Sequence, residues 1–308
     1  MITTVTLNPM VDKTVTVDAI RRGGIARGVT VHAIVGGKGV NVARQMHRLG
    51  DRTLAVAFAG GETGNMMERL LTEENLPHRL VPVAGMTREG VTYREADGTV
   101  TSVFEPQHAV SAAECRALVE ACVELLGGSS WVVCSGSSPC GEADGAFAEI
   151  IALGRERKIP AALDSYGPAM MLGAAATPAL LKMNTEEFEA TFGRRISSER
   201  EALEAAQAIV GRGIGYCVIS DGPRAMAAAT AGESWIVDPP CVEAVNPTGA
   251  GDALLAGILH GLARAWTFAD ALAFGAAAGA ANAAIWEVCT SGLEEIRGNL
   301  PRVRIRRG

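Results

Sequence analysis

From residue 111 to residue 284, segments with the period of a strand alternate with segments that have the period of a helix. Helices are predicted at 111–126, 142–156, 184–191, 198–210, 249–263 and 267–284. Strands are predicted at 131–134, 160–163, 180–182, 216–220, 225–230 and 235–237. Alternating strands and helices favour a mainly parallel sheet with helices on both faces. The sequence therefore predicts an α/β fold, whose ligands would bind outside the carboxyl ends of the strands.

The N-terminal part of the chain shows the same alternation with two interruptions. Strands are predicted at 2–7, 53–59 and 78–81, and helices at 36–49 and 62–74. The interruptions are strand-like segments at 14–17 and 28–35 and a hairpin of 87–94 with 99–104, joined by a type I′ turn at Asp97-Gly98. They predict a small β-sheet lid within a single domain of residues 1–308. The lid would come from about 12–35 and 87–107, inserted into a core of 1–11, 36–86 and 108–308.

The composition argues against several classes of protein. A formal net charge of −6 and an aromatic content of 5% do not suit a surface that binds nucleic acid, and the basic run at 302–307 is predicted to be a tail. The longest apolar stretch, 269–286, is mostly Ala and contains Asp270 and Asn282, so it predicts a buried helix and not a membrane span. The seven cysteines form no C-x-x-C pair, which predicts reduced, buried thiols in a cytoplasmic protein.

Several predicted strands end in polar or glycine-containing clusters. These clusters are Asn8-Pro9 with Asp12, residues 135–139, Asp164-Ser165, Asn184 with Glu187, and residues 220–222. Each cluster alone is more often an ordinary turn. Because the carboxyl ends of parallel strands meet at one edge of a sheet, the clusters together predict a polar cleft there.

Two glycine-rich turns precede predicted helices, at residues 36–39 and 249–251. Glycine lacks a Cβ atom, so the backbone N–H groups of such a turn can approach an anion, and the helix N-terminus adds further donors. Asp252 follows the second turn and would act either as a helix cap or as a base beside a bound phosphate. Neither turn matches the G-x-x-x-x-G-K-[S/T] or the G-x-G-x-x-G signature, which excludes the two most familiar phosphate-binding classes.

Two stretches show a resemblance to a known family. They are Gly36-Gly37-Lys38-Gly39-Val40-Asn41-Val42-Ala43 and Asn246-Pro247-Thr248-Gly249-Ala250-Gly251-Asp252. The chain resembles the PfkB-type carbohydrate kinases of the ribokinase-like superfamily, and is most similar to the 1-phosphofructokinase and tagatose-6-phosphate kinase branch. Shorter matches follow in family order at 6–9, 135–137, 184–187 and 220–222. The resemblance implies a ribokinase-like three-layer α/β/α core with a small β-sheet lid.

The resemblance also implies transfer of the γ-phosphoryl group of ATP to a sugar hydroxyl. Asp252 would then be the base, and the N–H groups of residues 249–251 would form an anion hole, which suits a reaction catalysed by positioning and electrostatics. The family's N-x-x-E element falls on Asn184 and Glu187, and Glu187 would order Mg²⁺ through water or phosphate. Residues implied to bind ATP are Asn184, Glu187, Ser220, Gly222, Thr248, Gly249, Gly251 and Asn282.

By the same resemblance, the acceptor would be held by Asp12, Gly37 and Asn41, since a carboxylate and an amide suit neighbouring sugar hydroxyls. A phosphate on the acceptor would need cations. The candidates are Lys38, Arg27 and Arg88, with Ser137 nearby. A solvated surface position is an equally open interpretation for the two arginines.

The predicted lid departs from the T-R-x-N-x-K pattern common in that branch. Residues 87–92 are Thr-Arg-Glu-Gly-Val-Thr, so Gly90 and Thr92 replace an asparagine and a lysine, and Glu89 adds an anion. A later E-P-G or M-P-G element is Glu105-Pro106-Gln107 here. If these side chains face the site, they weaken binding of a phosphorylated acceptor. A sugar phosphate is the favoured acceptor, and an unphosphorylated sugar, polyol or nucleoside is the alternative.

The sequence also allows other classes of function and predicts an assembly. A non-catalytic sugar-sensing protein on the same scaffold is the alternative of another class, and a hydrolase using Ser137 is disfavoured because G-x-S-x-G is missing. A lid hairpin exposes sheet edges and an apolar face that must be covered. The resemblance implies a homodimer that pairs lid to lid. Activation by a monovalent cation near Asn246 and Thr248 stays an open question at this point.

Overall fold

The computed structural model describes residues 1–308, which form two sheets and ten α-helices. The large sheet contains β1 (Ile2–Thr6), β4 (Thr53–Ala59), β5 (His78–Pro82), β8 (Trp131–Ser135), β9 (Ala161–Asp164), β10 (Leu180–Asn184), β11 (Tyr216–Asp221), β12 (Arg224–Ala229), β13 (Ser234–Asp238) and β14 (Arg304–Arg307). The small sheet contains β2 (Met10–Val17), β3 (Thr30–Gly36), β6 (Arg88–Glu95) and β7 (Val100–Phe104). The helices are α1 (Lys38–Arg48), α2 (Gly61–Glu73), α3 (Ala112–Leu126), α4 (Ala146–Glu156), α5 (Gly167–Ala175), α6 (Thr185–Phe192), α7 (Glu199–Val210), α8 (Ala250–Leu262), α9 (Phe268–Ala283) and α10 (Leu293–Asn299).

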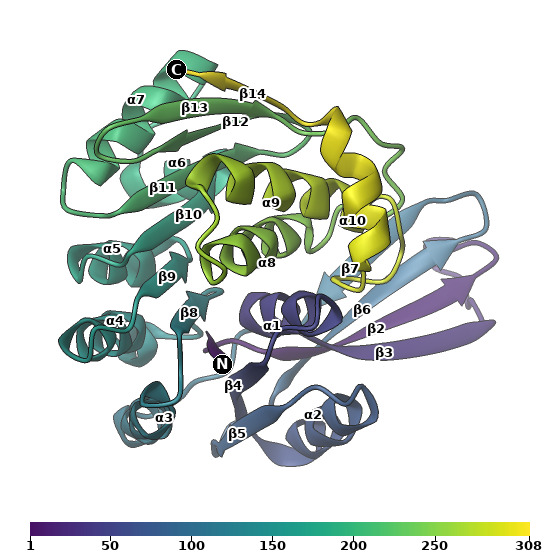
Figure 1. The fold of residues 1–308 in the computed structure, drawn as a ribbon. Coiled ribbons are helices and arrows are strands. Elements are labelled where there is room, and N and C mark those ends of the chain that lie inside the picture. Colours follow the sequence, from purple (N-terminus) through teal and green to yellow (C-terminus); the bar gives the residue numbers. More distant parts are fainter.

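The large sheet has the strand order β14-β13-β12-β11-β10-β9-β8-β1-β4-β5. Neighbouring strands are parallel from β5 to β11, and β12, β13 and β14 continue the sheet in antiparallel pairing. Helices α3 to α7 cover one face, and α1, α2, α8 and α9 cover the other (Figure 1). The prediction of a three-layer α/β/α core with a mainly parallel sheet is confirmed.

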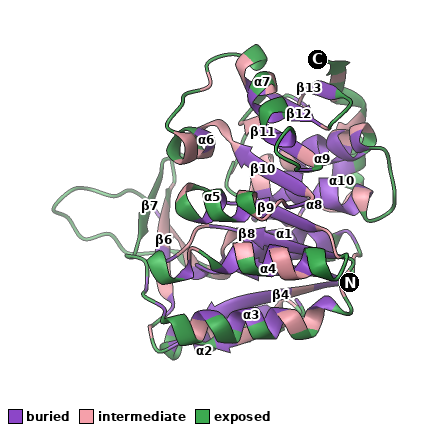
Figure 2. Cartoon of the chain, turned by 90° about the vertical axis from the view of Figure 1, so that its left-hand side faces the viewer, coloured by how far each residue is buried: buried purple, intermediate pink, exposed green.

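The central parallel strands consist mostly of apolar residues and small polar residues such as threonine, because they have no solvent-facing side. Strands β1, β8 and β9 are buried along their whole length, as expected for a sheet covered on both faces. One hydrophobic cluster fills the layer beneath α3 to α7, and a second packs α8 and α9 against the other face. Figure 2 shows these buried strands behind helices whose outer sides are exposed. None of the helices combines the length and the apolar character that a membrane span requires.

The small sheet has the order β3-β2-β6-β7, in which two antiparallel hairpins are joined by a parallel pairing of β2 with β6. Its register places one row of residues on the same face: Asp12, Ile34, Gly90 and Phe104. The next row on that face contains Thr14, His32, Thr92 and Ser102. The sheet projects from the core (Figure 1), and its action as a lid stays a prediction.

The turn between β6 and β7 differs from the predicted type I′ turn. A type I′ turn needs positive φ angles at both central residues, but of Asp97 and Gly98 only Gly98 has one, at 90°. The loop has three residues, since Gly98 N–H donates to Glu95 O (3.0 Å) and Glu95 N–H donates to Thr99 O (2.9 Å). It is a type I turn followed by a glycine bulge, in which only the last residue needs the left-handed region.

The sequence does not predict α5, α10 or β14. Helix α5 has Pro168 in its first turn, where a proline is tolerated because the N–H group is free in any case. The basic run at 302–307 is not a tail, because β14 pairs with β13 at the edge of the large sheet. The prediction of buried thiols is wrong for Cys241, which is exposed, and for Cys140, which is partly exposed.

Candidate active site

The polar strand ends predicted to converge do lie together. Strands β1 and β8 are neighbours at the point where the strand order reverses, which is where α/β sheets bind their ligands. Across this point Asn8 Nδ2 donates to Ser137 Oγ (2.9 Å), and Gly136 N–H donates to Asp164 O (2.8 Å). The loops that follow β1, β8 and β9 are therefore in direct contact.

A fully buried carboxylate lies at the centre of these strand ends. Asp164 accepts hydrogen bonds from Lys38 Nζ (3.1 Å) and Lys182 Nζ (3.0 Å). Lys38 also forms an ion pair with Glu187, which links the start of α1 to the start of α6. Burial acts to raise the pKa of Asp164, but the two ammonium groups outweigh it and hold that pKa below its usual range. Burial likewise acts to lower the pKa of Lys38, and the surrounding carboxylates raise it instead.

Asn184 and Glu187 form a capping box at the start of α6. Asn184 Oδ1 accepts from Glu187 N–H (2.7 Å), and Glu187 Oε2 accepts from Asn184 N–H (2.8 Å). Ser220 lies beside Asn184 in the register of β10 and β11, and Gly222 forms the turn that follows. No group of three or more His, Cys, Asp or Glu side chains is arranged so that it could hold a metal ion. A single carboxylate beside phosphate oxygens is nevertheless a usual Mg²⁺ arrangement. Because Lys38 and the Asn184 N–H group already engage the two oxygens of Glu187, this residue would reach the ion through water.

The turn before α8 leaves backbone N–H groups free at a helix N-terminus. Gly249 caps α8 in the left-handed region (φ 78°), which a glycine adopts at little cost. Ala250 N–H donates to Pro247 O (3.1 Å), so this group of the predicted anion hole is already used. The N–H groups of Gly249, Gly251 and Asp252 have no acceptor within the chain. They are the donors that an anion at this helix end can reach.

Lys182 packs against the same turn from β10. A Cβ atom on Gly251 would lie 2.8 Å from Lys182 Nζ, so only glycine lets the ammonium group approach this closely. Asn282 on α9 holds the turn from another side, because its Nδ2 donates to Thr248 O (2.8 Å) and its Oδ1 accepts from Cys289 N–H (2.6 Å). Both ends of the Asn282 amide are engaged with the backbone. Asn282 therefore shapes the turn.

Asp252, the predicted base, is 5% exposed and has one oxygen free. Its Oδ2 accepts from Asn41 Nδ2 (2.8 Å), while no group of the chain donates to its Oδ1. Burial raises the pKa of Asp252 to about 6, against the opposing charges of nearby lysines. A carboxylate with this pKa is mostly ionised at pH 7 and is a stronger base than an ordinary aspartate.

A cavity of about 700 Å³ lies between the small sheet, α1, α2 and the turn before α8. Asp12 and Thr248 both line it, so the predicted acceptor residue and the predicted nucleotide turn share one space. Asp12 Oδ1 is buried without a hydrogen-bond partner, and burial raises the pKa of this carboxyl. A buried polar oxygen without a partner is costly, and hydroxyl groups of a ligand would relieve that cost.

The altered lid residues face different sides of the small sheet. Glu89 lies on the face opposite to Asp12 and forms an ion pair with Lys13 (2.6 Å), so its charge does not face the cavity. Thr92 does line the cavity. At Gly90 a Cβ atom would lie 2.6 Å from a ring carbon of Phe104, which leaves no room for an asparagine. Of the expected changes, only the loss of a lysine at position 92 alters the cavity's charge.

Arg88 is half-buried, and its Nε atom has no hydrogen-bond partner. Buried His108 lies within electrostatic reach, and neither of its ring nitrogens has a partner. Burial lowers the pKa of both groups, and the charge of Arg88 lowers that of His108 further. No sequence motif points to His108. Arg27 lies in the exposed connection between β2 and β3 without a hydrogen bond or ion pair, and its role stays a prediction.

Sequence reasoning places Asp164 in the polar cleft without a partner, and it assigns no role to three other buried or half-buried charged residues of this region: Lys182, Arg44 and Glu74. One signal could have found two of them. Lys182 is charged within the apolar strand β10, and Arg44 lies among buried residues of α1. A charge in an otherwise buried segment indicates a partner elsewhere in the fold.

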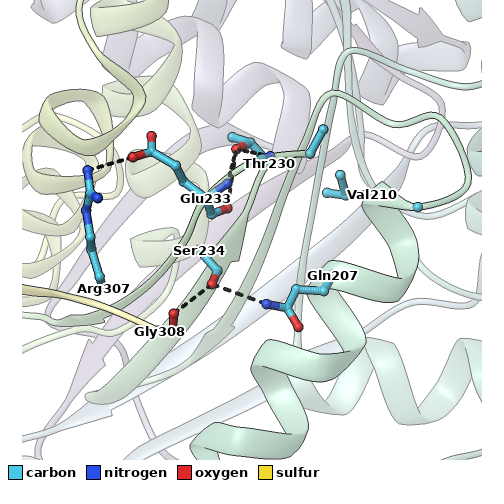
Figure 3. Close-up of a pocket in the computed structure, with 10 residues that line it drawn as sticks. Gln207, Val210, Thr230, Glu233, Ser234, Arg307 and Gly308 are labelled. Carbon is cyan, nitrogen blue, oxygen red and sulfur yellow. Dashed lines mark hydrogen bonds and ion pairs between the residues drawn. The ribbon is translucent and has the colours of Figure 1, made fainter.

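A second hollow, of about 550 Å³, lies between the end of α7, the β12–β13 connection and β14 (Figure 3). Its polar side chains pair with one another. Ser234 Oγ accepts from Gln207 Nε2 and donates to Gly308 O (both 3.2 Å), and Arg307 pairs with Glu233 (2.7 Å). None of the predicted site residues lines this hollow.

Comparisons with known proteins agree with this geometry. The family model described as "pfkB family carbohydrate kinase" matches residues 5–288. The chain belongs to this family. Within it, the 1-phosphofructokinase of Escherichia coli (strain K12) is 32% identical over 261 residues, which cover 85% of this chain and 84% of that protein. The ATP-dependent 6-phosphofructokinase isozyme 2 of Mycobacterium tuberculosis (strain ATCC 25618 / H37Rv) is 34% identical over 286 residues, covering 91% of this chain and 83% of that protein.

Solved structures of pfkB-family kinases have the same fold as this chain. Phosphofructokinase-2 from Escherichia coli in complex with potassium superposes with a TM-score of 0.91 at 29% identity, over 97% of this chain and 98% of that one. A ribokinase from Thermotoga maritima superposes with a TM-score of 0.74 at 20% identity, over 97% and 99%, which shows the shared fold alone. The resemblance stated from the two glycine-rich motifs is confirmed, as is the ribokinase-like fold.

Proposed function

We propose that this pfkB-family kinase transfers the γ-phosphoryl group of ATP to a hydroxyl group of a sugar phosphate. The observation that carries the proposal is the free Oδ1 atom of Asp252, a buried carboxylate with a raised pKa at the N-terminus of α8. The first residues of the turn that leads to Asp252, Asn246 to Thr248, line the cavity that Asp12 also lines. The family description supports the reaction type, and relatives named as phosphofructokinases support a phosphorylated sugar as acceptor.

In this proposal the chemistry needs one proton acceptor and one anion site. Asp252 Oδ1 takes the proton of the acceptor hydroxyl while the hydroxyl oxygen bonds to the γ-phosphorus. The bond from that phosphorus to the bridging oxygen breaks, and ADP leaves with the electron pair. The free N–H groups of the turn before α8 and the ammonium group of Lys182 stabilise charge on the transferring group. Mg²⁺ would neutralise phosphate charge, with Glu187 holding its waters.

The phosphate of the acceptor is placed at Arg88. This guanidinium is half-buried at the start of β6 with Nε unpaired, and His108 beside it has two unpaired ring nitrogens. Buried donors without partners are rare in folded proteins and are expected to be satisfied by a ligand or water. Phosphate oxygens accept hydrogen bonds from arginine strongly. Glu89, which would have opposed such an anion, is paired with Lys13 on the other face.

An acceptor panel tests this function. Purified protein with ATP and Mg²⁺ should release ADP with fructose 1-phosphate, fructose 6-phosphate or tagatose 6-phosphate, and each phosphosugar should exceed fructose, ribose and a nucleoside in kcat/KM. Turnover of the unphosphorylated compounds alone would replace the proposed acceptor with the alternative. Tight sugar binding without ADP release from any acceptor would favour a sugar sensor on the kinase scaffold.

A substitution at Arg88 separates acceptor recognition from chemistry. Arg88→Met should raise KM for the phosphosugar by roughly tenfold to a hundredfold, because a charge-assisted contact is lost, while kcat changes less. Arg200→Gln is the matched control, since Arg200 forms an exposed ion pair with Glu204 on α7 (78% exposed) and neither residue lines the cavity. An equal rise of KM in both variants contradicts the assignment of Arg88.

We also propose a homodimer through the small sheet. Val31 and Val103 lie on the face opposite to Asp12 and are 66% and 60% exposed, and Val29 and Ile25 beside them are exposed as well. Apolar side chains at the edge of a four-stranded sheet are stabilised by a partner. Charged substitutions at Val31 and Val103 should shift the mass measured by light scattering from dimer to monomer.

A monovalent cation and the cellular compartment complete the proposal. Phosphofructokinase-2 was solved with potassium, and the equivalent cation here is placed near Asn246 and Thr248, where Asn246 Nδ2 donates to Trp286 O (2.9 Å). Turnover in potassium should exceed turnover in N-methylglucamine at equal ionic strength. The seven cysteines form no disulfide, which supports a reducing compartment such as the cytoplasm.

A further inference from the structure

A chain of hydrogen bonds connects Asp252 to a buried ion pair that the mechanism above does not use. Asn41 Nδ2 donates to Asp252 Oδ2 (2.8 Å), and Asn41 Oδ1 accepts from Arg44 (2.9 Å). Arg44 in turn forms a two-pronged ion pair with Glu74 at the end of α2 (2.7 and 3.1 Å) and donates to Val35 O (2.7 Å). The connection therefore runs from α2 through α1 to the first turn of α8.

The ion pair at the outer end of this connection is mostly removed from water. The side chain of Arg44 is 6% exposed and that of Glu74 is 26% exposed. A buried ion pair contributes little net stability, because the cost of desolvating both charges offsets their attraction. The ion pair of Arg44 and Glu74 therefore matters more for the fixed position that it gives the guanidinium group than for stability. The fork of Arg44 meets both oxygens of Glu74, which fixes the plane and the position of the guanidinium group.

The fixed guanidinium decides which end of the Asn41 amide faces Asp252. An asparagine can present either its oxygen or its NH₂ group to a neighbour, whereas arginine can only donate. Because Arg44 donates to Asn41 Oδ1, the NH₂ group of Asn41 is directed at the carboxylate. In the reversed orientation, the amide oxygen would face a carboxylate oxygen and the NH₂ group would face Arg44. Both contacts are repulsive.

We propose that Arg44, held by Glu74, is a positioning residue that locks Asn41 as a hydrogen-bond donor to Asp252 and so keeps the base ready to accept a proton. This proposal rests on the proposed role of Asp252 as the base. The other titratable groups that face Asp252 are Lys38 on α1, Asp164 at the end of β9, Lys182 on β10 and the thiol of Cys289. They act on Asp252 through charge and do not contact the Asn41 amide.

The proposal predicts a change in pH dependence. A hydrogen bond to the ionised form lowers the pKa of a carboxyl, so its loss raises the pKa further above about 6. Arg44→Met should move the acid limb of kcat/KM upward by about one pH unit. Below the limb, kcat/KM should then fall roughly tenfold, and above pH 8 it should return to within about threefold of the parent. The loss should appear in kcat more than in KM.

Several variants separate positioning from a merely structural role. Arg44→Lys retains one donor, so its acid limb should shift upward by less than that of Arg44→Met. Glu74→Gln retains the acceptor oxygen without the charge, should shift the limb in the same direction by less, and serves if Arg44→Met does not fold. Asn41→Leu removes the hydrogen bond to Asp252 itself. The double variant Asn41→Leu/Arg44→Met should therefore show no larger shift of the acid limb than Asn41→Leu alone. Arg200→Gln is again the control, because its ion pair with Glu204 is exposed and lies on α7.

A titration of Asp252 itself keeps this test independent of the proposed function. In protein labelled with ¹³C at the aspartate carboxyl carbon, the Asp252 resonance is identified by its absence from Asp252→Asn. Its pKa should rise by about one unit in Arg44→Met and stay unchanged in Arg200→Gln. This result would stand even if no acceptor were phosphorylated. An Arg44→Met protein that is folded and keeps the parent's Asp252 pKa, or that loses activity equally at every pH, overturns the proposal.

Discussion

A carboxylate with little exposed surface lies at each end of helix α8, Asp252 on its first turn and Asp51 from the α1–β4 connection beside its last turn, and the two differ in how they are paired. At the first turn, Asp252 has a single donor, Asn41, and one free oxygen. At the last turn, Asp51 uses both oxygens, which pair with His260 Nδ1 and with Arg264 (both 2.7 Å). The Asp51 side chain is 7% exposed, but the residue as a whole is partly exposed whereas Asp252 is buried, so Asp252 has both fewer donors and less contact with water.

The difference in pairing gives opposite electrostatics at the two ends. Burial raises the pKa of Asp252 to about 6, because its few donors do not compensate for lost water. Burial also acts to raise the pKa of Asp51, but hydrogen bonds from His260 and Arg264 reverse the effect and lower it. A carboxylate with complete pairing stabilises the fold, whereas one left short of donors is available for chemistry. This distinction supports the proposed placement of the active site at the first turn of α8.

The largest expected effect is a loss of turnover when Asp252, the carboxylate with few donors, is substituted. Asp252→Asn should lower kcat roughly a hundredfold to ten-thousandfold, because the proton acceptor is lost while the amide retains the shape of the carboxyl. Acceptor and nucleotide binding, measured by calorimetry, should change little. Asp51→Asn is the matched variant and should keep kcat within about threefold. Unchanged turnover in Asp252→Asn would remove this residue as the base.

Stability should respond to pH in opposite directions at the two carboxylates. The unfolded carboxyl of Asp252 titrates near 3.8 and the folded one near 6, so its ionisation costs the folded state about 3 kcal/mol above pH 6. Asp252→Asn should therefore be more stable than the parent at pH 8, and the gap should close as the pH falls to 4. The stabilisation from Asp51 behaves oppositely and is lost only below 3.8, as the pH falls through its lowered pKa. Urea unfolding at several pH values measures both, and a gap for Asp252→Asn that does not depend on pH contradicts the account.

The positive charge beside the turn is expected to matter next. Lys182→Met removes the ammonium group that packs against Gly251 and leaves Asp164 with Lys38 as its only cation. We expect kcat to fall roughly a hundredfold, as for the loss of one donor from an anion site. The measurement is kcat at saturating ATP and acceptor, with circular dichroism as the check on folding. A folded variant with parental kcat would limit Lys182 to a structural role.

The smallest effect is structural and confined to the far end of α8. Asp51→Asn weakens two charge-assisted hydrogen bonds and should cost about 2 kcal/mol of unfolding free energy at pH 7. Arg264 is 40% exposed, so water compensates part of the loss on that side. Urea unfolding of parent and variant measures the difference. If Asp51→Asn loses activity while its stability is unchanged, the division between the two ends of the helix is wrong.

The sequence predicts the local parts of this account well. Both glycine-rich turns, Asp252 and the N-x-x-E element are contiguous motifs, and the alternating pattern predicts most strands and helices of the core. Strand β14 was beyond this reasoning because a short basic segment becomes a strand only when it pairs with β13. The type I′ turn was a wrong prediction because Asp97-Gly98 also suits a three-residue loop with a glycine bulge.

Partnerships between distant residues could not be predicted. Lys182 pairs with Asp164 from another strand, and Arg44 pairs with Glu74 from another helix. Periodicity shows that such a charge lies in a buried segment, but the identity of its partner depends on the packing of elements. For the same reason, the orientation of the side chains in the small sheet could not be predicted. Whether Glu89 faced the cavity depended on the strand register, and the structure turns it to the opposite face.

The account's central claim is that Asp252 accepts the proton during phosphoryl transfer. The most direct test is the pH profile of kcat/KM from pH 5 to pH 9, with ATP, Mg²⁺ and the best phosphosugar of the panel. This parameter reports groups of the free enzyme and of the free substrates, whose phosphates also titrate at about pH 6, so the comparison with Asp252→Asn isolates the contribution of Asp252. The account predicts an acid limb with an apparent pKa near 6, which disappears from the residual activity of Asp252→Asn. A limb that persists unchanged in Asp252→Asn, or a flat profile in the parent, would contradict it.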